Sequence, residues 1–373
     1  MTTTVNNEHK NIKVPNLRFP EFQGEWEKCK LGDECNVFMC KRILASQTNT
    51  EGSVPFYKIG TIGGTPDAYI SKELFDDYKA KYNYPHKGEV MITCAGTVGK
   101  CVIYDGKDAY YQDSNIVWID NPSQHINNGF LYHLLANVNW RKLNSTTIIR
   151  IYNDDLRNLK LSYPQIEEQK KISRLLSLLD ERIATQNKII DKLQSLIKGI
   201  AQNIVRNNKP NVRISDCLEC NSSTLQESDV CEHGTYPVYG ANGIVGYLKN
   251  YNTEGEAVYI IKDGSGVGTV SYVTGKCSAT GTLNTLQAKE GYSLHYLYYL
   301  LKVFNFEPYK TGMAIPHIYF KDYGKAKFFC PSYTEQLRYA RLLSAIDNKL
   351  SIEQNILTGL TLQKQCLLRQ MFI

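Results

Sequence analysis

The chain has 373 residues, of which 42% are hydrophobic and 21% charged, a composition typical of a folded protein rather than a disordered one. Its 43 lysines and arginines exceed its 37 aspartates and glutamates, so the net charge of +6 permits a nucleic-acid partner without requiring one. The sequence has no signal peptide and no apolar run of roughly 18 residues that could span a membrane. We therefore expect a cytoplasmic protein.

The N-terminal part of the chain is predicted to form a short tail and one domain. Residues 1–14 are expected to be a flexible tail. Residues 15–165 contain short β-branched and aromatic runs between glycine-containing turns, which predicts an α+β domain. Strands are expected at 89–93, 101–104 and 116–119, and a helix at 130–140.

Residues 166–205 are predicted to form one long helix. Apolar residues recur at the a and d positions of a heptad from Ile172 to Ile204, with one vacancy at Gln186. Pro164 lies just before the first turn, where proline ends an extended segment without harming a helix. A helix of about 40 residues would be roughly 60 Å long and needs another long helix to cover its apolar seam.

The next part of the chain, residues 206–332, has a residue pattern similar to that of the first domain. Short strand-like runs and turns again predict an α+β domain. Strands are expected at 257–261 and 269–273, and a helix at 294–304.

This second domain contains one cluster of potential metal ligands. Cys217, Cys220, Cys231 and His233 could hold zinc tetrahedrally. Their spacing does not match a familiar zinc finger, and no second CxxC follows. We favour the interpretation that they are reduced cysteines near a strand edge.

Residues 333–373 are predicted to form a second long helix because they repeat the first. Segments 164–193 and 331–360 align without a gap at an offset of 167 residues. The seam of the second copy contains Glu353 at the position of Gln186; a polar residue in a seam costs stability but can fix register and partner. Ungapped repetition of sustained heptads is hard to obtain by chance, which argues against two unrelated amphipathic helices.

The two long helices are predicted to pack against each other. Because a whole domain separates them in the chain, they can meet only if the two halves fold back on one another. The result would be an antiparallel coiled coil with an approximate two-fold axis, holding the two α+β domains at its opposite ends. The residues expected to pack between the helices are Leu176, Leu179, Ile183, Ile190, Leu193, Leu343, Ile346, Leu350, Leu357 and Leu360.

The two domains are also similar to each other, as the runs AGTVG at 95–99 and GSGVG at 264–268 illustrate. A duplicated scaffold with divergent loops indicates two sites of one kind with different specificities. The glycines at 264–268 lack the spacing of a phosphate-binding loop, and no adenine methyltransferase motif is present. We interpret Asp113 and Asp263 as isolated carboxylates, so that no catalytic set is recognisable.

The repeated helices resemble those of the specificity (S) subunits of type I restriction-modification systems. The run LLRQMF at 367–372 is similar to that family, and so are LRFPEF at 17–22, YPVYGANGIVGY at 236–247 and IKDGSGVG at 261–268. The resemblance covers nearly the whole chain and is more specific in the helices than in the domains. It implies a non-catalytic DNA-binding protein whose two target recognition domains each read one half of a bipartite DNA target. The helices would then set the spacing between the halves.

The resemblance also implies partners. Two methyltransferase (M) subunits would dock on this chain, joined by restriction and translocase (R) subunits, in the bacterial cytoplasm. S-adenosylmethionine, ATP and magnesium would be bound by these partners and no cofactor or metal by this chain. The complex would methylate adenine N6 or cleave DNA that lacks the mark.

Candidate DNA-binding residues are basic, polar or aromatic residues in predicted loops. Arg150 could pair bidentately with guanine, and Asn242 with adenine. Any one of them could instead be a solvated loop residue, and His317 could simply be packed. In the first domain the candidates are Lys41, Arg42, Arg141, Lys142, Thr146, Thr147, Arg150, Tyr152 and Asn153. In the second they are Tyr239, Asn242, Lys310, Thr311, His317 and Tyr319.

Three other functions remain open at this point. The chain could be a coiled-coil scaffold whose two domains bind peptides, and DNA binding with a methyltransferase partner would exclude that. It could be a self-sufficient modification enzyme, although the missing methyltransferase motif argues against this. It could also be a DNA-binding protein that works alone, in which case it would bind DNA tightly without partners.

Overall fold

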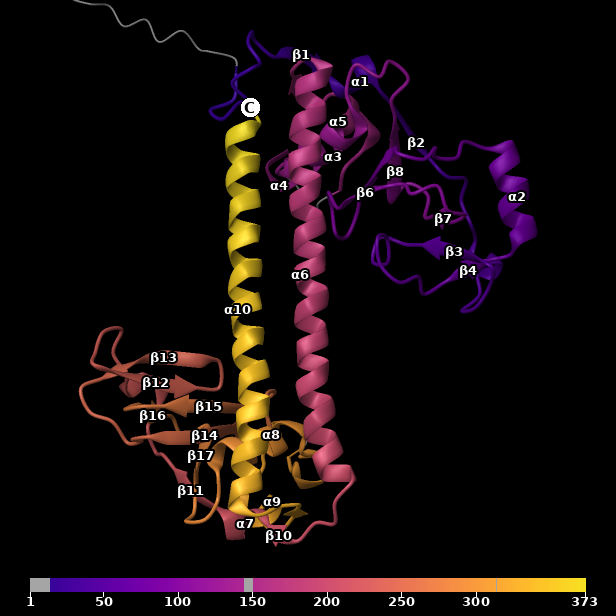
Figure 1. Ribbon diagram of the computed structural model, residues 1–373. Helices are drawn as coiled ribbons and strands as arrows, with labels where there is room; N and C mark the ends of the chain where they lie inside the picture. The colour runs from indigo at the N-terminus through magenta and orange to yellow at the C-terminus, as the bar shows by residue number, and fades with distance from the viewer. Residues whose placement is uncertain (1–13, 144–149, 313) are drawn as a thin grey trace, which may run out of the picture. The chain divides into compact units, whose positions relative to one another are not determined.

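The computed structural model of the chain describes residues 14–143, 150–312 and 314–373. The chain divides into two compact units (Figure 1): unit 1 consists of Met1–Thr185 with Thr358–Ile373, and unit 2 of Gln186–Leu357. Each unit contains sheets, short helices and part of both long helices, which confirms the mixed α+β class. Within the described ranges, no helix combines the length and the apolar character that a membrane crossing requires.

The strands of unit 1 are β1 (Glu27–Lys30), β2 (Asn36–Met39), β3 (Val54–Tyr57), β4 (Tyr69–Ile70), β5 (Val90–Thr93), β6 (Cys101–Ile103), β7 (Tyr110–Tyr111), β8 (Ile116–Asp120) and β9 (Lys160–Tyr163). The main sheet is antiparallel, in the order β2-β8-β5-β6. A smaller sheet has the order β4-β3-β7, in which β3 and β7 are parallel. Strands β1 and β9 pair separately.

The helices of unit 1 before the long helix are short. They are α1 (Leu31–Glu34), the 3-10 helix η1 (Ala45–Gln47), α2 (Lys72–Lys81), α3 (Asn128–Asn137), α4 (Trp140–Leu143) and α5 (Asn153–Arg157). Helix α3 begins after Asn127, whose side chain accepts a hydrogen bond from the amide of Phe130 at 3.1 Å.

The central strands β5 and β8 are buried on both faces. Val90 and Ile92 pack on one face with Phe130 of α3. Met91 and Trp118 pack on the other face, in the cluster that includes the α2 residue Phe75. Burial of both faces explains why these strands read as continuous apolar runs rather than alternating ones.

The strands of unit 2 are β10 (Val212–Arg213), β11 (Leu218–Ser222), β12 (Tyr236–Gly240), β13 (Gly243–Leu248), β14 (Glu256–Ile261), β15 (Val270–Thr274), β16 (Ser278–Ala279), β17 (Leu283–Ala288) and β18 (Lys327–Phe328). Its short helices are α7 (Ile214–Cys217), η2 (Glu227–Asp229), α8 (Leu294–Val303), η3 (Glu307–Tyr309) and α9 (Phe320–Tyr323).

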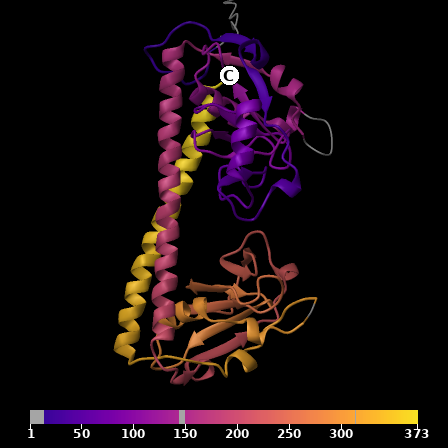
Figure 2. The same cartoon turned by 90° about the vertical axis from the view of Figure 1, so that its right-hand side faces the viewer.

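Unit 2 repeats the topology of unit 1. The antiparallel order β11-β17-β14-β15 corresponds to β2-β8-β5-β6, and β13-β12-β16 corresponds to β4-β3-β7, including one parallel pair. Helix α8 takes the place of α3, and Ser293 caps it as Asn127 caps α3. Figure 2 shows these strands to one side of the helical pair of unit 2.

The long helices are α6 (Ile166–Arg206) and α10 (Tyr333–Met371). They pack against each other within each unit. In unit 2, Ile190 and Ile197 share a core cluster with Leu343 and Leu350. In unit 1, Met371 belongs to the same cluster as residues near the start of α6. The early part of α6 therefore meets the end of α10, as an antiparallel pair requires.

The residues predicted to pack between the helices differ in their burial. Buried are Leu176, Leu179, Ile190, Leu343, Leu350 and Leu360. Partly buried are Ile183, Leu193, Ile346 and Leu357.

A buried glutamine at the start of each long helix joins that helix to its own unit. In unit 1, the side-chain oxygen of Gln169 accepts from the amide of Asn127 at 2.7 Å, and its nitrogen donates to the carbonyl of Pro164 at 2.7 Å. In unit 2, Gln336 accepts from the amide of Ser293 at 2.9 Å and donates to the carbonyl of Pro331 at 2.9 Å. Each glutamine thus satisfies buried main-chain groups where α3 or α8 begins.

Domain limits stay a prediction. The predicted tail, residues 1–14, lies outside the described residues except for Val14. Val14 packs, partly buried, against the core of unit 1.

Candidate nucleic-acid interface

In unit 1, three loops are joined by main-chain hydrogen bonds beyond the end of strand β5. The amide of Cys94 donates to the carbonyl of Asn115 at 2.7 Å, and the amide of Ile151 donates to the carbonyl of Cys94 at 2.8 Å. Cys94 directly follows β5, and Asn115 directly precedes β8. We name as loop cluster 1 the segments 94–100, 112–115 and 150–153.

Unit 2 has the same arrangement at the end of β14. The amide of Lys262 donates to the carbonyl of Thr282 at 3.0 Å, and the amide of Ile318 donates to the carbonyl of Lys262 at 2.9 Å. Lys262 therefore corresponds to Cys94, and Ile318 to Ile151. We name as loop cluster 2 the segments 262–268, 280–282, 310–312 and 314–319.

Loop cluster 1 holds the guanidinium group of Arg150 beside an exposed aromatic ring, and a second guanidinium, that of Arg42 from outside the cluster, pairs with Asp113. Nη2 of Arg150 donates to both the carbonyl and the hydroxyl of Ser114, at 3.4 Å each. Nε of Arg42 forms an ion pair with Asp113 at 3.3 Å. The guanidinium carbon of Arg150 lies 5.9 Å from the ring centroid of Tyr152, which is 61% exposed. This set offers several hydrogen-bond donors and one flat apolar surface.

Ser114, which accepts the hydrogen bonds of Arg150, has an unusual backbone conformation. Its φ is 50°, in the left-handed region that residues other than glycine rarely adopt. The corresponding residue of loop cluster 2 is Gly281.

Loop cluster 2 is organised around a carboxylate and an imidazole. Nδ1 of His317 lies 2.7 Å from Oδ1 of Asp263, and both side chains are 35% exposed. The amide of Thr311 donates to the carbonyl of His317 at 2.9 Å, and the amide of His317 donates back at 2.7 Å. Asp263 and His317 thus occupy the positions that Ala95 and Arg150 occupy in loop cluster 1.

Further polar and aromatic residues lie close to His317 in the chain. Tyr319, which corresponds to Tyr152, is 48% exposed, and Nζ of Lys321 lies 5.3 Å from its ring centroid. Nζ of Lys310 forms an ion pair with Glu307 at 2.5 Å. Each loop cluster therefore contains an exposed ring with a cation nearby, Arg150 within loop cluster 1 and Lys321 just after loop cluster 2.

The β12–β13 hairpin adjoins loop cluster 2. The amide of Thr280 donates to the carbonyl of Tyr239 at 2.9 Å. The ring of Tyr239 packs against a small core cluster, and burial raises the pKa of its hydroxyl. Asn242, at the turn of the hairpin, is exposed. Tyr239 therefore supports the hairpin, whereas Asn242 presents an amide to solvent.

The remaining candidates of unit 1 lie outside loop cluster 1 or at its edge. Lys41 is exposed, with Nζ 5.3 Å from the ring centroid of Tyr82. Arg141 and Lys142 are exposed on α4, and Asn153 is the first residue of α5. Outside the described residues lie Thr146 and Thr147.

Sequence reasoning missed the partners of the two acidic residues. The interpretation of Asp113 and Asp263 as isolated carboxylates is wrong, because each is paired with a cation or an imidazole. Asp263 and His317 are separated by 54 residues, and no sequence pattern links them. Only the pairing of the strands brings them together.

The four residues considered as zinc ligands are not gathered into one described metal-binding group. Cys217 ends α7 and is buried, and a hydrogen bond with Cys330 raises its pKa. Burial raises the pKa of Cys220 to about 11, so this thiol stays protonated, whereas Cys231 is exposed. In the part of the chain that the structure describes, no group of three or more His, Cys, Asp or Glu residues is placed to hold a metal ion.

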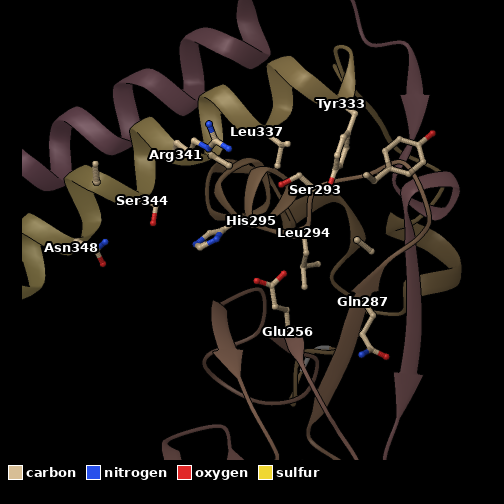
Figure 3. Close-up of a pocket in the computed structure, with 14 residues that line it drawn as sticks. Glu256, Gln287, Ser293, Leu294, His295, Tyr333, Leu337, Arg341, Ser344 and Asn348 are labelled. Carbon is tan, nitrogen blue, oxygen red and sulfur yellow. The ribbon is translucent and has the colours of Figure 1, made fainter.

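A cavity of about 650 Å³ lies in unit 2, at the other end of β14 from loop cluster 2. Figure 3 shows Tyr333 and Arg341 reaching it from α10, with His295 from α8 and Glu256 from the start of β14. Because β14 has six residues, roughly 20 Å of strand separates this cavity from Lys262. The cavity is therefore not part of the loop cluster.

Unit 1 has a hollow at the corresponding place. Its volume is about 400 Å³. Ile166 and Asn127 line it, at the positions that Tyr333 and Ser293 occupy in the cavity of unit 2. A recess beside the first turn of the long helix is thus a feature of both repeats.

Comparison with known proteins finds one family twice in the chain. The family described as "Type I restriction modification DNA specificity domain" matches residues 23–195 and again residues 207–362. The two matches together cover most of the chain.

Two curated relatives carry related descriptions. A putative type I restriction enzyme specificity subunit of Haemophilus influenzae is 48% identical over 169 residues, which are 45% of this chain and 43% of that protein. A putative type I restriction enzyme specificity subunit of Methanocaldococcus jannaschii is 26% identical over 198 residues, 49% of this chain and 46% of that protein. The matched part of this chain thus spans less than half the length of either relative.

Solved structures share the fold. A crystal structure of a type I restriction-modification S subunit from M. genitalium matches 96% of this chain and 99% of its own, with a TM-score of 0.69 and 19% identity. A chain from a study of complex assembly and conformational transition in the type I restriction-modification system matches 92% of this chain and 96% of its own. Its TM-score is 0.51 at 15% identity.

Proposed function

Because the chain belongs to the type I restriction modification DNA specificity family, we propose that it is the DNA-recognition subunit of a type I restriction-modification complex. Each unit binds one half of a bipartite DNA target, and the helices α6 and α10 set the distance between the halves. The chain itself is not catalytic and binds no cofactor. It directs adenine N6 methylation or restriction, which partner subunits carry out in the bacterial cytoplasm.

The observation that carries this proposal is the duplicated loop cluster. The two clusters have the same main-chain hydrogen bonds but different side chains, with Arg150 and Ser114 in one and His317 and Asp263 in the other. The same backbone arrangement with different side chains is suited to two domains that recognise different DNA sequences. Hydrogen bonds to base edges would provide the sequence specificity, and nearby cations would contact phosphates.

The proposed partners are two methyltransferase subunits together with restriction and translocase subunits. The recess beside the first turn of α6 recurs beside the first turn of α10, which supports a partner present in two copies. S-adenosylmethionine, ATP and magnesium would be bound by those partners.

The test is single-molecule sequencing of host DNA for N6-methyladenine, with and without this gene. The expected result is a split motif, marked on both strands, that disappears on deletion. If no motif changes although the tagged chain co-purifies with an active methyltransferase, the proposal is wrong.

A further inference from the structure

The Asp263–His317 pair determines which hydrogen-bonding group loop cluster 2 presents. An ionised carboxylate can only accept hydrogen bonds, so Nδ1 of His317, 2.7 Å from Oδ1 of Asp263, must carry a hydrogen. In a neutral imidazole, a hydrogen on Nδ1 leaves the lone pair on Nε2, at the opposite edge of the ring. Nε2 of His317 is thus a hydrogen-bond acceptor on the edge of the ring that faces away from Asp263.

The main chain holds both partners of this pair in place. The amide of Gly264, next to Asp263, donates to the carbonyl of Pro316, next to His317, at 3.0 Å. Thr311 and His317 exchange two further main-chain hydrogen bonds. Gly312 has a φ of 86°, and a Cβ there would collide with the carbonyl of Ile315, so this turn requires glycine. The orientation of the imidazole is set by the fold before any ligand arrives.

We propose that Asp263 is a positioning residue that fixes the tautomer of His317, and that Nε2 of His317 accepts a hydrogen bond from the amino group of a base. In the major groove that group is N6 of adenine or N4 of cytosine. This inference rests on the proposed function and adds to it the chemical class of one recognised base.

The equivalent position of loop cluster 1 offers the opposite chemistry. Arg150 stands where His317 stands, and a guanidinium has only donors. The hydroxyl and carbonyl of Ser114 hold it, and Ala95 replaces Asp263. Arg150 is suited to the acceptors of guanine, whereas His317 is suited to an amino group. One position of the repeat therefore distinguishes the two half-sites.

The informative variant is Asp263→Asn. The asparagine amide can donate to Nδ1, which moves the hydrogen of the imidazole to Nε2 and converts the outward atom into a donor. The preference for adenine or cytosine at one base position should then fall by about fivefold or more, the low end of what one base contact contributes. Base preferences at every other position of the DNA target should stay unchanged.

The experiment selects DNA from a library randomised across the target, using the chain assembled with its methyltransferase subunits, and sequences the bound fraction. His317→Ala should erase the preference at the same base pair that Asp263→Asn alters. The matched control is Glu254→Gln, which removes the ion pair between Glu254 and Lys276, 3.5 Å long, elsewhere in unit 2. It should leave the selected sequence unchanged.

The outcomes separate the two proposals. If the wild-type complex selects no two-part sequence, the proposed function fails. If the wild type selects one and Asp263→Asn selects identical bases, the inference is overturned. A uniform loss of affinity across the half-site, with unchanged base preferences, also overturns it, because it indicates a purely structural role for the pair.

Discussion

Gln186 and Glu353 contact each other in the seam between the long helices, although 167 residues separate them. The side-chain nitrogen of Gln186 donates to the main-chain carbonyl of Glu353 at 3.0 Å and also to its carboxylate. The two residues are equivalent in the sequence repeat, and in a two-fold arrangement only residues at the axis contact their own equivalents. Within unit 2, this contact therefore pairs the two copies of the repeat at equivalent positions.

Gln186→Leu should destabilise unit 2 and loosen the register of the helices. The variant loses two buried hydrogen bonds and leaves acceptors of Glu353 without this donor, a cost of about 1–3 kcal/mol. Lys349 and Gln186 both lower the pKa of Glu353, so part of the effect comes from the carboxylate. Thermal unfolding measures the loss. The double variant Gln186→Leu with Glu353→Leu should recover stability, and a double variant no more stable than the single one would contradict the role given to the pair.

Lengthening both helices should change the gap between the half-sites and not the half-site sequences. Seven residues inserted after Gln186 and seven after Glu353 keep the heptad register and add roughly 10 Å of helix. At 3.4 Å per base pair, this corresponds to about three extra base pairs. Sequencing of N6-methyladenine gives the gap directly. New half-site sequences with an unchanged gap would contradict a spacing role for the helices.

Arg150→Ala should relax recognition at one half-site and leave the other half-site unchanged. The lost guanidinium contact is worth about 1–3 kcal/mol of discrimination. Competition binding with DNAs that differ in one half-site measures the effect. His317→Ala serves as the counterpart, because it should affect only the other half-site. If Arg150→Ala and the wild type show equal base preferences at both half-sites, Arg150 does not contribute to DNA recognition.

Gln169→Leu should loosen unit 1 locally, and Gln336→Leu should do the same in unit 2. Each variant leaves buried main-chain groups without partners, at about 1–3 kcal/mol per group. Hydrogen exchange measures the effect, with faster exchange expected in α3 for Gln169→Leu and in α8 for Gln336→Leu. The two variants are controls for each other. Equal acceleration in both units by either variant would contradict a local role.

His133 should make unit 1 sensitive to mild acid. It is 1% exposed, and burial lowers its pKa to about 4. The unfolded chain binds a proton near pH 6.5 and the folded chain only near pH 4, so stability is retained above pH 6.5 and lost as the pH falls between these values. The loss amounts to at most about 3 kcal/mol.

Denaturant unfolding at pH 7 and pH 4.5 checks this, and His133→Gln should reduce the difference between the two values. His233→Gln is the matched control, since His233 is exposed. An unchanged pH dependence in His133→Gln would show that other groups dominate the acid response.

The sequence predicted the two long helices, because heptad periodicity is a local signal and the repeat confirmed it independently. The equivalence of Gln186 and Glu353 also followed from the alignment of the two repeats. The repeat already contained Gln169 and Gln336, but their hydrogen bonds to Asn127 and Ser293 were not predicted, because nothing in a pattern shows which buried amide faces which main-chain group.

The loop clusters show where sequence reasoning stops. Arg150 and His317 were recognisable as candidates from their residue types and aligned positions. Their partners Ser114 and Asp263 were not, since a carboxylate 54 residues away becomes a neighbour only when strand order and register are set. Contacts that repeat every few residues, or that recur at one offset, can be read from the chain itself. Contacts between loops of different strands depend on the sheet, and the tertiary structure alone decides them.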